Sequence, residues 1–399
     1  MSNINKHYII QVLYSVGFMF CSGSILQTFL LQIGFAEQQV YLFNALIQVV
    51  QVLTIAVMTF MSGKIKQIKK VSSISYLPLS IMAVIFIIGA INPYIRGNFY
   101  ITVVFIIAAF VNVGVGMHSI MAYILPYLTI EMSEYGKMTS MGIVLSGCIS
   151  FALSLLHACI VSKFDYIASM IWFFILAGIC FVISSITCFS MKEIEQSYEN
   201  KTVKREEIIA ALRNSDTYIL LFSNFARGIA TGIINMITVI AISAALIKEN
   251  TSSLVNVIMQ VAMVAGNLIY MFSYKKFSSK KLLILATVGY CVLFPLSFYG
   301  NSLWFFCIFG CVYLFKMIID TAIPVIITEI IPQEQIGAYT SIRMLIFIGA
   351  QAVSTLLITP IISLIGYSGL LIVASVMMFI CGFTYWVIAK KNKKVLSNN

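Results

Sequence analysis

Residues 303–330 read LWFFCIFGCVYLFKMIIDTAIPVIITEI, a mostly apolar run that carries two charges, Lys316 and Asp320, well inside it. The run exceeds the ~20 residues that a helix needs to cross the hydrocarbon core of a bilayer. It therefore predicts a transmembrane helix with charged side chains near the membrane midplane. A charge at that depth is costly unless it is paired or hydrated, so both residues are candidates for a functional role.

The whole chain has the same apolar character. Of its 399 residues 60% are apolar and only 10% are charged, whereas a soluble protein is about 25% charged. This composition excludes a soluble enzyme, a disordered chain and a disulfide-stapled secreted domain, and the length of the runs argues against a β-barrel. We predict an all-α integral membrane protein with twelve transmembrane helices, at 7–33, 39–61, 72–91, 99–130, 138–160, 167–190, 216–247, 252–273, 281–299, 303–330, 336–363 and 368–389.

The distribution of the 25 Lys and Arg residues predicts the orientation of these helices. With the N-terminus inside, 19 of them fall on one side of the membrane, three on the other and three within spans, at Arg227, Lys316 and Arg343. Because positive charges favour the inner face, we expect both termini in the cytoplasm of a multi-pass protein of the cell membrane. The same dispersal argues against a nucleic-acid partner despite the net charge of +11.

A weak internal repeat relates the two halves of the chain. A shift of 198 residues places Pro126 on Pro324 and Glu131 on Glu329, in helices that are equivalent in order. A shift of 212 residues pairs Asn44 with Asn256, Gln48 with Gln260 and Lys64 with Lys276. Two copies in the same orientation predict parallel repeats about an axis along the membrane normal.

The longest charged loop separates these copies. We predict an N-terminal six-helix bundle at 1–190, a cytoplasmic linker at 191–215 and a C-terminal six-helix bundle at 216–399 that ends in a short basic tail. With six plus six helices, the long central loop and basic loops after the second and eighth helices, the chain resembles the major facilitator superfamily of secondary transporters. The spacing from Lys316 to Pro324 and the sequence IGYSG at 365–369 are similar to its oligosaccharide/proton symporter branch.

Polar residues inside the predicted spans fall on single helical faces. In the helix at 216–247, Asn224, Arg227, Thr231 and Asn235 are spaced to form one stripe, and similar stripes occur elsewhere. Such faces either line a hydrophilic cavity or form hydrogen bonds between helices. We expect a cavity, and the candidate substrate-binding residues are Arg227, Lys316, His118, Asn224, Asn235, Gln27, Asn44, Gln48, Asn256 and Gln260.

The charges near the midplane predict the kind of ligand. Lys316 and Asp320 are four residues apart and can pair along one helix, or Asp320 can bridge to Arg227. One carboxylate cannot neutralise two cations, so an anionic or strongly hydrogen-bonding ligand could complete the set. The alternative is a purely structural salt-bridge network. Asp320 is the first candidate for a proton carrier, and His118 is the second.

The resemblance also implies contacts that gate the transporter. Candidates are Glu131 and Glu329, which end their helices and can meet the basic loops at Lys64 and Lys276, together with Arg343. We expect a monomer that needs no cofactor or metal, because the three His are far apart and the cysteines lack a partner cluster.

The function predicted is secondary active transport of a small polar solute, sugar-like or anionic, by alternating access and coupled to protons. Alternatives on the same fold are efflux of amphipathic compounds and flipping of lipid-linked glycolipids. A non-transporting membrane sensor is an alternative of another class. An enzyme is not expected, because no nucleophile, base and orienting group come together in the sequence and no phosphate-binding loop is present.

Overall fold

The computed structural model describes residues 2–61, 65, 67–130, 132–192, 215–248, 251–273, 276–331 and 333–396. These residues form helices joined by short connections, without a β-strand among them. Within them, 11 helices are long and apolar enough to cross a membrane. The predicted all-α transmembrane fold is therefore confirmed.

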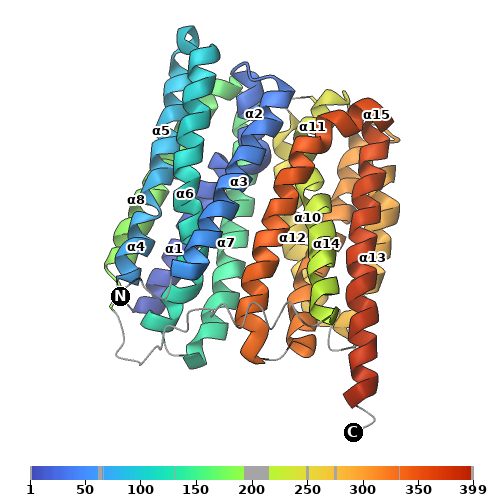
Figure 1. Cartoon of the computed structure of the whole chain (residues 1–399). Coiled ribbons are helices and arrows are strands. Elements are labelled where there is room, and N and C mark those ends of the chain that lie inside the picture. The colour runs from blue at the N-terminus through green and yellow to red at the C-terminus, as the bar shows by residue number, and fades with distance from the viewer. Residues whose placement is uncertain are drawn as a thin grey trace. The chain divides into compact units, whose positions relative to one another are not determined.

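The helices pack into two compact units. Unit 1 comprises residues 1–202 with 248–257, and unit 2 comprises 203–247 with 258–399. The helices that begin in unit 1 are α1 (Asn3–Cys21), α2 (Gly23–Gln32), α3 (Glu37–Met61), α4 (Ile68–Ile74), α5 (Leu77–Ile91), α6 (Asn98–Thr129), α7 (Met132–Val161), α8 (Tyr166–Phe189) and α12 (Ser253–Ser273), whose later turns belong to unit 2. The remaining helices, all in unit 2, are α10 (Ser215–Asn235), α11 (Ile237–Ser243), α13 (Ser279–Leu296), α14 (Ser302–Ile330) and α15 (Gln333–Leu396) (Figure 1).

Three of the predicted spans are interrupted in the structure. The first breaks at Ser22, which is extended, and at Gly23, whose φ of 59° favours glycine. The seventh breaks at Met236, between α10 and α11, and the third begins as the short helix α4 before α5. The expected boundaries missed these breaks because the apolar pattern continues through them.

The last two predicted spans lie within one assigned helix, α15. Gly366 inside it has φ 72° and ψ 179°, a conformation that is not helical, and it falls between the predicted spans 336–363 and 368–389. The 49-residue apolar segment Ile342–Lys390 is therefore two helices that meet at a sharp bend. This explains why 11 segments are counted where the sequence predicts twelve.

Unit 1 is held together by aromatic packing between its helices. Helix α1 packs against α7 and α8, α5 packs against α8, and α3 packs against α6. Phe29, Phe86 and Phe174 come from three of the helices and are fully buried, with ring centroids 4.8 to 5.7 Å apart. Such packing holds membrane helices together in place of the hydrophobic effect, which is absent between them because lipid tails are as apolar as the side chains.

Unit 2 is built around a close approach of α10 to α15. A Cβ added at Gly228 would lie 2.5 Å from the Phe347 carbonyl oxygen, and one added at Gly232 would lie 2.9 Å from the Gln351 carbonyl oxygen. These two glycines therefore let the helix backbones touch, as small residues do in membrane helix pairs. The contact fixes the face of α10 that carries Arg227.

Candidate functional site

A cluster of three charged side chains lies inside unit 2. Arg227 on α10 donates from Nη2 and Nε to Asp320 Oδ1, at 2.6 and 3.1 Å. Lys316, one turn before Asp320 on α14, donates from Nζ to Asp320 Oδ2 at 2.6 Å. The side chains are only 12%, 19% and 8% exposed for Arg227, Asp320 and Lys316. The sequence left open whether Asp320 pairs with Arg227 or with Lys316, and in the structure it contacts both.

The cluster carries one more positive than negative charge. Its three members are two cations and one carboxylate, and each carboxylate oxygen accepts from a different cation. The cations also lie near aromatic rings, with Arg227 Cζ 4.6 Å from the centre of the Phe347 ring and Lys316 Nζ 5.3 Å from that of Tyr313. These rings stabilise a cation without cancelling its charge. The arrangement is therefore suited to attract an anion.

Asn224 lies one turn before Arg227 and belongs to a buried hydrogen-bond network. Its Nδ2 donates to the hydroxyl oxygens of Tyr385, at 2.5 Å, and Tyr339, at 3.3 Å, and the two hydroxyls lie 3.1 Å apart. Asn224, Tyr339 and Tyr385 are all fully buried. The network links α10 to the two parts of α15 that precede and follow Gly366.

The other predicted polar residues of unit 2 are placed as follows. Asn235 Nδ2 donates to Gln351 Oε1 at 3.3 Å, which joins α10 to α15. Gln260 on α12 is half-buried, and its Oε1 lacks a hydrogen-bond partner among the described residues. Neither residue contacts the charge cluster through a hydrogen bond that the structure records.

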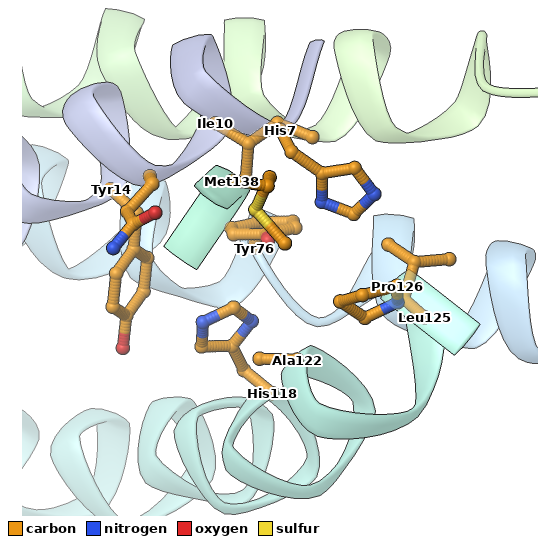
Figure 2. Close-up of a pocket in the computed structure, with 10 residues that line it drawn as sticks. His7, Ile10, Tyr14, Tyr76, His118, Ala122, Leu125, Pro126 and Met138 are labelled. Atoms are coloured by element: carbon orange, nitrogen blue, oxygen red, sulfur yellow. The ribbon is translucent and has the colours of Figure 1, made fainter. Parts of the chain in front are cut away.

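In unit 1, the predicted residue His118 lines a pocket of about 230 Å³. The pocket lies between α1, the start of α5, α6 and α7 (Figure 2). The His118 ring lies 4.2 Å from that of Tyr14 and 4.7 Å from that of Tyr76, between centroids. The pocket belongs to unit 1, whereas the charge cluster belongs to unit 2.

The amides predicted in unit 1 are engaged with its helices. Asn44 Nδ2 donates to the Val40 carbonyl oxygen of its own helix at 2.8 Å. Asn256 Nδ2 donates to Ser154 Oγ at 2.7 Å, which ties the first turns of α12 to α7. Gln27 is 1% exposed and Gln48 is 9% exposed, so both are buried. Asn44 is half-buried, and the cavity expected at these residues stays a prediction.

The predicted gating residues are described only in part. Lys64 and Glu131 lie outside the described residues, as does the side chain of Glu329, which is in the last turn of α14. Lys276 is exposed in the turn before α13. Arg343 on α15 is half-buried, and its Nη1 has no hydrogen-bond partner within the described segments. The gating contacts stay a prediction.

Several residues of these sites were not singled out by the sequence. Tyr339, Tyr385 and Phe347 lie on α15 and meet α10 only through the fold, so spacing along the chain could not reveal them. His7, Gln11 and Tyr14 are different, because their spacing of four and three residues places them on one face of α1. That stripe was a usable signal. Among the described residues, no group of His, Cys and carboxylates could hold a metal ion.

The packed apolar helices of the described residues define a polytopic membrane protein. In comparison with known proteins, residues 220–399 match the model of the Major Facilitator Superfamily. The chain also has the fold of solved structures of such transporters over nearly its whole length. The predicted resemblance to this family is thereby confirmed.

Three of these solved structures illustrate the likeness. The nucleoside transporter NupG is 13% identical with a TM-score of 0.67, covering 97% of this chain and 99% of its own. A D-xylose-proton symporter is 10% identical with a TM-score of 0.71, covering 96% of both chains. A bacterial homologue of the iron transporter ferroportin, in an inward-facing state, is 12% identical with a TM-score of 0.71, covering 97% of this chain and 98% of its own. No curated protein matches the chain.

Proposed function

We propose that the protein is a proton-coupled secondary active transporter of the cell membrane that moves a small anionic solute by alternating access. The observation that carries the proposal is the excess positive charge of the cluster formed by Arg227, Lys316 and Asp320. Two cations that share one carboxylate are held in a mostly buried place, where a bound anion would supply the missing negative charge. The names of the three solved neighbours refer to a nucleoside, a sugar and iron, so the fold by itself does not select the solute.

Asp320 is the proposed proton carrier. It is the carboxylate that both cations contact, so protonation of Asp320 would weaken its hold on Arg227 and Lys316 together. Because protonation of Asp320 would free both cations for an anion, proton binding and anion binding at the cluster are coupled, and each raises the affinity of the other. The direction of transport and the number of protons moved per anion depend on which conformational state of the transporter the anion and the proton each favour. We further propose that the chain acts as a monomer with both termini in the cytoplasm.

The test is a thermal-shift panel on the full chain purified in detergent. Carboxylates, phosphorylated metabolites, neutral sugars and lipophilic cations are each added to the wild type, to Arg227→Gln and to Lys248→Gln. A ligand that binds the folded state raises the unfolding midpoint. We expect a carboxylate or phosphate to raise the midpoint of the wild type and of Lys248→Gln, whose lysine is exposed outside the spans, but not of Arg227→Gln.

Other results would overturn the proposal in distinct ways. A shift with lipophilic cations alone, unaffected by Arg227→Gln, would make the cluster structural and favour efflux of amphipathic compounds. Binding of an anion without any flux of that anion in proteoliposomes would favour a membrane sensor. Flux of a labelled glycolipid without any anion response would favour lipid flipping.

A further inference from the structure

The pocket in unit 1 has a composition that differs from the charge cluster. Its polar lining residues are His7, Gln11, Tyr14, Tyr76 and His118, and its apolar lining residues are Ile10, Ala122, Leu125, Pro126 and Met138. None of these described lining residues has an acidic side chain or is a Lys or Arg. The pocket therefore offers hydrogen bonds and aromatic surface without a fixed charge, which is typical of sites for uncharged ligands.

His118 is the polar group that this pocket leaves unsatisfied. The residue is 8% exposed, and its Nδ1 is buried without a hydrogen-bond partner in the described part of the chain. An imidazole nitrogen that is buried and unpaired costs about 1–3 kcal/mol relative to one that is hydrogen-bonded. Figure 2 shows the His118 ring entering the pocket from α6, with the Tyr14 ring beside it. A ligand or a water molecule in the pocket could satisfy this nitrogen.

The hydrogen bond between His7 and Thr129 determines which nitrogen of His7 carries the proton and which remains an acceptor. The Thr129 hydroxyl donates its single proton to the Leu125 carbonyl oxygen at 2.8 Å, so Thr129 Oγ1 can only accept from His7 Nε2, 2.8 Å away. With the proton on Nε2, a neutral His7 keeps Nδ1 as an acceptor. His7 therefore offers an acceptor for a donor on the ligand.

A proline adds a second acceptor at the wall of the pocket. Pro126 lies inside α6 and has no backbone N–H, so the Ala122 carbonyl, four residues earlier, lacks its helical donor. Ala122 and Pro126 both line the pocket. The pocket thus offers two acceptors, His7 Nδ1 and the Ala122 carbonyl oxygen. It also offers polar side chains, the Gln11 amide and the His118 imidazole, and two tyrosine rings against which a flat ligand can lie.

We infer that unit 1 holds a second binding site, in the pocket lined by His7 and His118, for a small uncharged ring compound with donors and acceptors on its edge. Two kinds of molecule share this chemistry: a heteroaromatic base, which stacks on the tyrosine rings, and a sugar ring, which places its C–H face on them. A volume of about 230 Å³ accepts one such ring but not a drug-sized molecule. The inference does not rest on the anion proposed for unit 2.

The chain contains only three histidines, which makes a direct test possible. The full chain is labelled with ¹⁵N-histidine and reconstituted in nanodiscs, and the imidazole signals are followed while adenine or D-glucose is added to about 10 mM, enough for a millimolar Kd. We expect one probe to shift the signals of His118 and His7 in a saturable way. His157 is the internal control, since it is buried outside the pocket with Nε2 3.3 Å from Met170 Sδ.

Two variants show whether the response comes from the pocket. His118→Phe keeps a flat ring between Tyr14 and Tyr76 but removes both nitrogens, and we expect about tenfold weaker binding, read from the His7 signals, for the loss of one hydrogen bond. Ala122→Phe fills the pocket while leaving both histidines in place, so it keeps the test decisive if His118→Phe does not fold. His157→Phe is the matched control and should bind the probe as the wild type does.

The outcomes separate the alternatives. A saturable response to adenine alone supports the site and assigns a heteroaromatic base, whereas a response to D-glucose alone supports it and assigns a sugar ring. The inference is overturned if neither probe shifts His7 and His118 saturably, which would leave the pocket to water, or if the response persists in Ala122→Phe. The anion panel uses different ligands, so either proposal can fail without the other.

Discussion

Arg227 directs two donors, Nη2 and Nε, to a single oxygen of Asp320, at 2.6 and 3.1 Å. This geometry leaves the second carboxylate oxygen to Lys316, which approaches it from the preceding turn of α14. Each oxygen of Asp320 is thus assigned to one cation, and the carboxylate holds together two charges that would otherwise repel each other. Removal of different members of the cluster therefore has unequal consequences.

Asp320→Asn should destabilise the protein more than Lys316→Met does. The first change leaves Arg227 and Lys316 buried without a counter-charge, and breaking a buried ion pair in this way costs about 3–5 kcal/mol of unfolding free energy. The second change leaves the Arg227–Asp320 pair intact and neutral. Thermal unfolding in detergent measures the difference, and equal midpoints for the two variants would show that water, not Asp320, compensates the cations.

Proton coupling should be lost in the double variant Asp320→Asn with Lys316→Met. This pair of changes removes the carboxylate but keeps the net charge of the cluster at one positive, since only Arg227 remains charged. In proteoliposomes we expect exchange of the anion to continue while accumulation driven by an imposed pH gradient disappears. Accumulation at the wild-type level in the double variant would exclude Asp320 as the proton carrier.

The orientation in the membrane can be checked by labelling introduced cysteines from outside the cell. Lys163 and Lys248 are exposed in loops predicted to be extracellular, whereas Lys276 is exposed in a loop predicted to be cytoplasmic. A membrane-impermeant maleimide should therefore label Lys163→Cys and Lys248→Cys but not Lys276→Cys in intact cells. Labelling of the wild type gives the background signal from its nine native cysteines. The opposite labelling pattern would show that the predicted topology is inverted.

The sequence predicted the transmembrane helices well because hydropathy alone decides whether a segment enters a bilayer. It pointed to the charged cluster because an ionisable residue in an apolar run is conspicuous, and in the structure Asp320 contacts both of the cations that the sequence offered it, Arg227 and Lys316. It did not predict the break at Ser22 and Gly23, where no charge or proline interrupts the apolar pattern.

The remaining parts of the sites depend on which helices become neighbours. Asn224 and Tyr385 form a hydrogen bond although they are 161 residues apart in the sequence, and no local sequence pattern can predict such a contact. The amides Asn44 and Asn256 were expected at a cavity, yet a stripe of amides looks the same in sequence whether it faces water or a neighbouring helix. The structure adds the hydrogen bond of Asn256 to Ser154 on α7, and the cavity expected at these amides stays a prediction.

The close approach of α10 to α15 yields the last prediction. Gly228→Ala would place a methyl group 2.5 Å from the Phe347 carbonyl oxygen and 2.6 Å from Ala350 Cβ, so the two helices must move apart. Overpacking of this kind costs about 1–3 kcal/mol of unfolding free energy. Because Arg227 precedes Gly228, the same movement should also displace the Arg227 guanidinium from Asp320 and weaken anion binding.

Gly349→Ala on α15 is the matched control, since its Cβ would meet nothing within 4 Å. In that helix alanine is favoured over glycine by about 1 kcal/mol, so the control should unfold at the same temperature or slightly higher. A Gly228→Ala protein as stable as Gly349→Ala would mean that the α10–α15 contact is looser than the structure has it.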